Sequence, residues 1–115
     1  MNSIIVKNLE IIDVSAFITR KATDLSYMFS GCSSLTELKL DSFDTSNVKN
    51  MNSMFNSCTG IHYLDLFTFN TTLCTKFDNI FDNIDNMTVR INPTLGQNLL
   101  NDLKNKDYNI DIKTI

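Results

Sequence analysis

The chain has 115 residues, of which 43% are apolar and 20% are charged, so it has the size and composition of one compact folded domain. Ten Lys and Arg residues against 13 Asp and Glu residues give a net charge of −3, which argues against the basic surface of a nucleic-acid-binding protein. No apolar run approaches the ~20 residues that a membrane span requires. Residues 1–14 lack the basic start, long apolar stretch and cleavage site of a signal peptide, so the chain as written is expected in the cytoplasm.

A period of about 26 residues runs through most of the chain, and such a period is typical of repeat proteins. Met28-Phe29, Met54-Phe55 and Ile80-Phe81 superpose at this spacing, and apolar residues recur at several further positions of each copy. More positions are apolar in all three copies than the overall apolar content would produce by chance. We therefore predict a repeat protein in which each unit buries its apolar side against its neighbours.

Each repeat is predicted to contain a short strand followed by a helix. Segments 35–40 and 61–66 share the pattern LxxLxL, and their last three residues alternate as in a strand with one buried face. The hydroxyl pairs Thr45-Ser46 and Thr71-Thr72 are N-cap candidates for helices whose apolar residues follow at steps of three and four. These helices are expected to end near Gly31, Ser57 and Asn83. Successive strands are then parallel, about 4.8 Å apart, with the helices covering one face of the sheet.

Charged residues at one position of each predicted strand support this register. The residue between the last two apolar positions is, in chain order, Asp13, Lys39, Asp65, Arg90 and Asp111. The sign of the charge alternates along this series, and opposite charges on neighbouring strands attract each other. The pattern therefore predicts five adjacent strands with these side chains next to one another.

Both ends of the chain depart from the repeat, as caps do. We divide the single domain into an N-terminal cap and first strand (1–14), the repeats (15–91) and a C-terminal capping helix and strand (92–115). Asn92-Pro93 suits the start of that helix, and residues 108–113 suit the last strand. The apolar face of the helix carries Leu95, Leu99, Leu100 and Leu103. Because both ends look finished, a complete small protein is expected.

Two stretches of the sequence carry a family resemblance. DLSYMFSGCSSLTELKLDSFDTSNVKNMNSMFNSCTGIHYLDL and FNTTLCTKFDNIF resemble BspA-type leucine-rich repeats, and are similar to the mycoplasma lipoprotein repeat, whose units have nearly the same length. The likeness covers residues 22–84 well and extends through degenerate copies to about 9–91. It implies an α/β fold: a short right-handed leucine-rich-repeat-like solenoid of parallel strands backed by helices. Such proteins, often at the cell surface or secreted, are thought to serve adhesion or protein recognition, so the resemblance implies no catalytic residues.

Cysteine and histidine form no recognisable catalytic or metal-binding pattern. Cys32, Cys58 and Cys74 contain no CxxC pair, and buried thiols are favoured over a disulfide between Cys32 and Cys58. His62 is the only histidine, and a structural or contact role is favoured over catalysis. A glycosidase-like pair is weighed for the carboxylates Glu10, Asp13, Glu37 and Asp65. Since nothing predicts a pocket that would raise one pKa, we expect no enzyme activity, cofactor or metal.

Two function classes remain for the exposed face of the predicted sheet. The first is a non-enzymatic module for protein–protein recognition, because repeat proteins bind through extended surfaces. Its candidate binding residues are Glu37, Lys39, His62, Tyr63, Asp65 and Arg90, on a face that also carries Glu10, Ile11, Asp13, Thr36 and Thr88. The alternative is a structural or assembly protein whose end strands pack into an oligomer, surface layer or particle. We therefore expect a protein partner or a homo-oligomer. We expect no nucleic-acid partner and no membrane-spanning segment.

Overall fold

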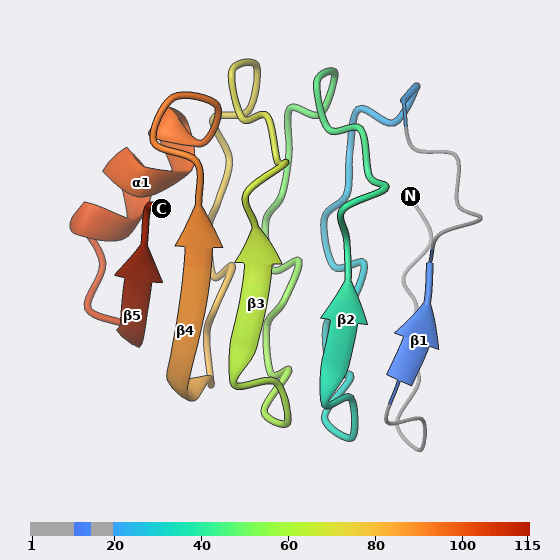
Figure 1. The fold of residues 1–115 in the computed structure, drawn as a ribbon, viewed down its shortest axis with the longest axis vertical. Helices are drawn as coiled ribbons and strands as arrows, with labels where there is room; N and C mark the ends of the chain where they lie inside the picture. Colours follow the sequence, from blue (N-terminus) through green and yellow to red (C-terminus); the bar gives the residue numbers. More distant parts are fainter. Residues whose placement is uncertain (1–10, 15–19) are drawn as a thin grey trace.

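The described part of the chain folds as an α/β structure with parallel strands and one helix (Figure 1). The structure, a computed structural model, describes residues 11–14 and 20–115. Its strands are β1 (Ile11–Asp13), β2 (Glu37–Lys39), β3 (Tyr63–Leu66), β4 (Asp85–Ile91) and β5 (Asn109–Lys113), and its helix is α1 (Gln97–Lys104). The predicted N-terminal cap over residues 1–10 lies outside the described residues. Within the described residues, no helix is long and apolar enough to cross a membrane.

The strand register follows the repeat in the first four strands. β1 and β2 pair in parallel with Asp13 opposite Lys39, and β3 and β4 pair in parallel with Asp65 opposite Arg90. Both neighbour relations were predicted from the alternating charges, and both are confirmed. The alternation of buried Leu64 and Leu66 with exposed residues on β3 shows why: a shift by one residue would turn the apolar side chains out of the core.

The prediction of one continuous five-stranded sheet is wrong. The strands form a two-stranded sheet, β1-β2, and a three-stranded sheet, β3-β4-β5, with a break between β2 and β3 (Figure 1). The charge pair predicted to join β2 to β3 is not made, because each member has a partner on its own sheet. Lys39 lies 3.6 Å from Glu37 on β2, and Asp65 lies 3.1 Å from Arg90 on β4.

The predicted place of Asp111 beside Arg90 is also wrong. In the observed register Asp111 lies opposite Thr88, and Lys113 lies opposite Arg90. Tyr108, the residue before β5, is held against the preceding repeat, where its hydroxyl donates a 2.6 Å hydrogen bond to Asp82. An irregularity between Asp85 and Met87 then adjusts the pairing of β4 with β5.

The predicted repeat helices are wrong as well, since α1 is the only helix among the described residues. On the side of each repeat opposite the strands, every second backbone N–H donates to a carbonyl of the following repeat. Leu25 donates to Asn50 at 2.9 Å and Phe29 to Met54 at 3.0 Å. The next repeat continues the pattern, with Phe55 donating to Ile80 at 3.1 Å. An N–H that donates to a neighbouring repeat is not available for the hydrogen bond four residues back that defines a helix.

Tight turns between these donors explain the spacing that resembled a helix. The N–H of Met54 donates to the carbonyl of Met51, and the N–H of Cys58 donates to that of Phe55. A chain of such turns brings every third residue to the same side, as one turn of helix also would. At these positions the backbone of Tyr27, Ser53 and Asn79 has φ near +60°, which a right-handed helix does not allow.

The threonines expected to cap helices instead connect neighbouring repeats. The buried Thr45 hydroxyl accepts a hydrogen bond from the Asn70 N–H at 2.8 Å and donates to the Asn70 carbonyl at 3.0 Å. The buried Thr71 likewise donates from its hydroxyl and its N–H to the carbonyl of Leu95. Each hydroxyl thus satisfies backbone groups that stacking has removed from water.

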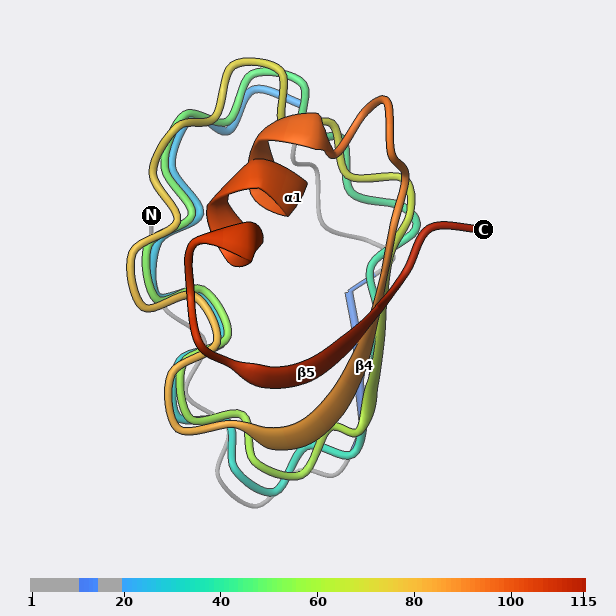
Figure 2. The same cartoon turned by 90° about the vertical axis from the view of Figure 1, so that its left-hand side faces the viewer.

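Stacked aromatic columns form the centre of the core. The rings of Phe29, Phe55 and Phe81 lie one above the next, with centroids 5.9 and 5.7 Å apart. The ring of Tyr108 ends this column: its centroid lies 6.0 Å from that of Phe81, and the two rings meet edge to face. A second column pairs Phe43 with Phe69 at 6.3 Å. Successive repeats follow nearly the same path when seen end-on (Figure 2), so identical residues meet.

The C-terminal helix closes the core at the β5 end, close to the predicted position (Figure 2). It buries Leu99, Leu100 and Leu103 as expected, whereas Leu95, predicted on the same face, lies before the helix and is 38% exposed. The Asn92 side chain accepts hydrogen bonds from the N–H groups of Thr94 and Leu95, as the predicted N-cap would, and the Gly96 N–H donates to the Asn92 carbonyl, but the regular helix begins only at Gln97.

Replacing Phe55 by alanine is expected to lower the free energy of unfolding by about 3–5 kcal/mol, because its ring is buried between two other rings. Urea denaturation would measure the loss. Phe67→Ala, which removes a phenylalanine that is only partly buried, is the matched control and should cost less. A loss below about 1 kcal/mol for Phe55→Ala would contradict its place in the core.

Replacing Tyr27 by asparagine is expected to raise the free energy of unfolding by about 0.5–1 kcal/mol, because asparagine accepts a left-handed backbone more easily than an aromatic residue does. Tyr27 adopts φ 62° with its side chain 53% exposed. Tyr63→Asn, at a strand position, should bring no such gain. A denaturation midpoint that does not rise for Tyr27→Asn would refute the proposed strain.

Candidate functional site

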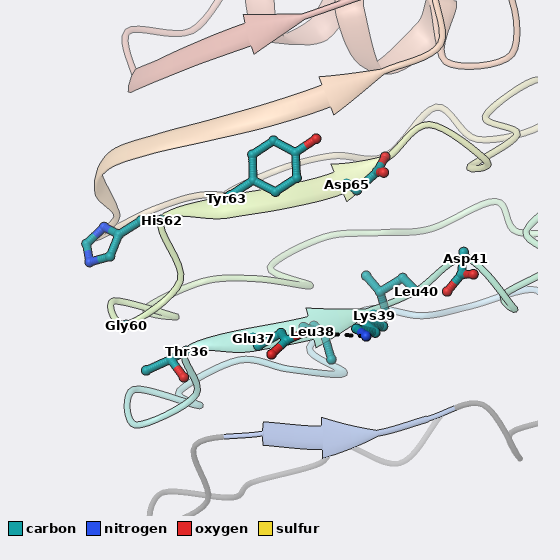
Figure 3. A pocket seen from close by; sticks show the side chains of 10 residues that line it. All are labelled: Thr36, Glu37, Leu38, Lys39, Leu40, Asp41, Gly60, His62, Tyr63 and Asp65. Atoms are coloured by element: carbon teal, nitrogen blue, oxygen red, sulfur yellow. Dashed lines mark ion pairs between the residues drawn. The ribbon is translucent and has the colours of Figure 1, made fainter. Parts of the chain in front are cut away.

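The break between β2 and β3 forms a groove of about 1020 Å³ on the exposed side of the strands (Figure 3). One wall comes from the segment through β2 and the other from the segment that enters β3. The lining residues are Thr36, Glu37, Leu38, Lys39, Leu40, Asp41, Gly60, His62, Tyr63 and Asp65. Five of the six candidate binding residues line the groove, and the sixth, Arg90, is adjacent to it through Asp65.

Strand alternation places the polar walls. Leu38 on β2 and Leu64 on β3 are buried, so the residues on either side of them face outward. On β2 these are Glu37 and Lys39, which form an exposed ion pair (Figure 3). The half-exposed ring of Tyr63 stands on the β3 side, where it is 50% accessible. The groove therefore combines an aromatic ring, charges of both signs and the largely buried side chains of Leu38 and Leu40.

Gly60 allows the two repeats to touch at the start of the groove. A Cβ atom at this position would lie 2.6 Å from the Leu35 carbonyl oxygen and 2.9 Å from that of Ser33. Real Cβ atoms do not approach backbone so closely, so glycine is required for this packing. The contact holds the segment leading to β3 against the preceding repeat.

Arg90 lies on β4, outside the groove, and holds the side chain of Asp65 in the β3 wall. Its guanidinium donates to both oxygens of Asp65 at 3.1 and 3.3 Å and lies 3.8 Å from the centre of the Phe67 ring. Its Nε also donates to the Ile115 carbonyl at 3.1 Å. An arginine that is bonded to both carboxylate oxygens and stacked on a ring has little freedom, so Asp65 is held in place. Sequence reasoning missed Phe67, because Asp41 stands at the equivalent place one repeat earlier and no repeat column marks it.

His62 directly precedes β3 and has contacts to the neighbouring repeat. Its Nδ1 is 3.3 Å from the Asn86 carbonyl, and its own carbonyl accepts a hydrogen bond from the Thr88 N–H at 2.9 Å. Ile11 and Asp13 pair through their backbones with Glu37 and Lys39. Glu10 lies outside the described residues. The structure thus gathers the β2 and β3 candidates at the groove, while Ile11, Asp13 and Thr88 belong to the flanking strands β1 and β4.

The thiols are buried away from the groove and form no disulfide, as the favoured interpretation predicted. The Cys58 thiol donates a hydrogen bond to the Phe29 carbonyl at 2.8 Å. Burial, with a smaller contribution from the nearby Cys32, raises the pKa of the Cys58 thiol to about 12. Burial also raises the pKa of Cys74. These two thiols therefore stay protonated at neutral pH, and thiolates are the reactive form of cysteine. Within residues 11–14 and 20–115, no cluster of three or more metal-binding side chains occurs.

The protonated Cys58 thiol predicts a loss of stability at alkaline pH. Between its ordinary pKa of 9.0 and its raised pKa of about 12, the unfolded chain releases a proton that the folded chain keeps. The free energy of unfolding should therefore fall by about 1.4 kcal/mol per pH unit from this group alone, with full stability retained below pH ~9. Urea denaturation midpoints measured from pH 7 to about 11 would give this loss of stability. In Cys58→Ala the decline should be shallower, and equal declines in both proteins would contradict the assignment.

A family model described as a Mycoplasma protein of unknown function, DUF285, matches residues 1–109. Neither a curated protein nor a solved structure matches the chain. The family is related to the mycoplasma repeats that the sequence resembles, and the match extends over β1 to β4, the groove and α1 and ends at the first residue of β5. The chain therefore belongs to the DUF285 family of Mycoplasma proteins.

Proposed function

We propose that this protein is a non-enzymatic recognition module that binds a partner protein through the groove between β2 and β3. The observation that carries the proposal is the coincidence of two independent features. The groove opens at a break in strand pairing, and its walls carry the outward-facing residues that the repeat pattern selected as candidates. Clefts that combine apolar surface with a few polar side chains are the usual ligand sites of proteins.

The partner is proposed to present an extended segment in which a basic side chain accompanies an apolar one. The lining residues run along both strands, which suits an extended chain more than a compact small molecule (Figure 3). Of the three carboxylates that line the groove, Glu37 pairs with Lys39 and Asp65 with Arg90, which leaves Asp41 without an ion pair among the described residues. The exposed ring of Tyr63 offers an aromatic surface, and tyrosines of this kind are enriched among residues that dominate binding energy.

The architecture is proposed to be a short right-handed solenoid of the leucine-rich-repeat type. Backbone hydrogen bonds with a constant offset from one repeat to the next, parallel strands and the stacked column of Phe29, Phe55 and Phe81 support this interpretation. A crossover between parallel strands is right-handed in nearly all proteins. In such an architecture the strand face forms a continuous binding surface to which each repeat contributes a row of side chains.

Tyr63→Ala is expected to weaken binding of groove ligands about tenfold or more, because it removes the largest exposed contact in the groove. The ligands would be peptides selected from a random displayed library on the unaltered protein, with affinity measured by calorimetry. Tyr27→Ala is the matched control, since Tyr27 is 53% exposed and Tyr63 50%, and Tyr27 does not line the groove.

Peptides that lose affinity with Tyr63→Ala and keep it with Tyr27→Ala would support the groove, especially when they carry paired basic and apolar residues. If both variants lose the same affinity, or if neither loses any, the binding surface lies elsewhere. Melting temperatures of both variants would show that the fold is intact.

A further inference from the structure

The outer edge of β5 is an unpaired strand edge at one end of the molecule. β5 pairs with β4 on one side, and no described residue pairs with it on the other (Figure 1). A strand edge presents backbone N–H and carbonyl groups that can pair with another chain, and proteins usually shield such edges with bulges, prolines, short strands or charged side chains that a second copy would repel. β5 has five residues and contains no proline.

Two charges on β5 have no partner among the described residues. Asp111 and Lys113 are both exposed, and neither forms an ion pair there. Lys113 lies opposite Arg90, a residue of the same charge that is already paired with Asp65. Like charges opposite each other are unfavourable, so Lys113 gains nothing from its own sheet.

Apolar surface accompanies these charges. Ile112 is 39% exposed although the residue opposite it on β4, Val89, is fully buried. Ile115, just beyond the strand, is 94% exposed. The edge therefore combines unpaired backbone, two isoleucines and two opposite charges two positions apart.

We propose that β5 binds β5 of a second copy of this chain, in an antiparallel pair whose two-fold axis passes beside Ile112. Ile112 then lies opposite Ile112 of the second copy. Asp111 lies opposite Lys113 of the second copy, and Lys113 lies opposite Asp111 of the second copy. Each unpartnered charge finds a partner of opposite sign, and a two-fold axis closes the assembly at a dimer.

The charges select this register over its neighbours. An axis at Asp111 would place two carboxylates opposite each other. An axis at Ile110 would place Ile112 opposite Tyr108, whose hydroxyl already bonds Asp82, and Asp111 opposite the uncharged Asn109. Only the axis at Ile112 forms two pairs of opposite charge within the strand.

This surface is separate from the groove, because β4 lies between β5 and β3, the strand that forms one wall of the groove (Figure 1). The proposal therefore does not rest on the recognition function. Both grooves of a dimer would remain open, so a partner carrying two binding segments would gain from binding them together.

Sedimentation equilibrium of the full chain from about 10 μM to about 1 mM would test for a monomer–dimer equilibrium. Asp111→Lys and Lys113→Glu should each raise the dimer dissociation constant about tenfold or more, since each creates two like-charge pairs. The double variant Asp111→Lys/Lys113→Glu should restore dimerisation. An equimolar mixture of the two single variants should form a heterodimer, because every cross-strand pair then has opposite signs.

Three outcomes would overturn the proposal: a monomer at all concentrations, a dimer that the single charge reversals leave unchanged, or growth into open-ended oligomers. The last result would indicate head-to-tail contacts in place of a two-fold axis. Thermal melting of each variant checks its fold. Tyr63→Ala should leave the dimer unchanged, which separates this result from any loss of binding in the groove.

Discussion

Backbone hydrogen bonds between neighbouring repeats, each joining equivalent segments of two successive units, are the constraint on which the rest of this structure depends. They satisfy N–H and carbonyl groups on the side opposite the strands, where every second residue from Leu25 to Gly31 and from Met51 to Ser57 donates to the next repeat. Because the donor of one repeat needs the acceptor of the next, no unit is satisfied alone. Each repeat therefore depends on its neighbours both for its stability and for its position, as in other repeat architectures.

The same constraint explains the core and its unusual backbone. A constant offset places equivalent residues above one another, so Phe29, Phe55 and Phe81 stack and Thr45 reaches the backbone of Asn70. It also requires tight turns with positive φ at matching positions. Asparagine and glycine meet that requirement with little strain, whereas Tyr27 does so at a cost. The many asparagines of the sequence are consistent with this demand.

The two proposed surfaces arise where the regular pattern ends. Between β2 and β3 the outward charges pair within their own sheets, Lys39 with Glu37 and Asp65 with Arg90, and a groove opens between them. At β5 the alternation of charge along the sheet stops, and Lys113 follows Arg90. In both places the repeat supplies a rigid support, and side chains that no longer serve the stacking remain available for other contacts.

The sequence by itself determined where the strands lie, which apolar columns are buried and how β1 pairs with β2 and β3 with β4, because these follow from alternation and a fixed period. It also identified five groove residues as an exposed group. Only the tertiary structure decided between helix and turns, since steps of three residues occur in both and the choice depends on hydrogen-bond partners in the next repeat. The pattern of charges also left the break between β2 and β3 open, because Lys39 and Asp65 each have an alternative partner on their own sheet, and it did not contain the contact of Tyr108 with Asp82 beside the start of β5.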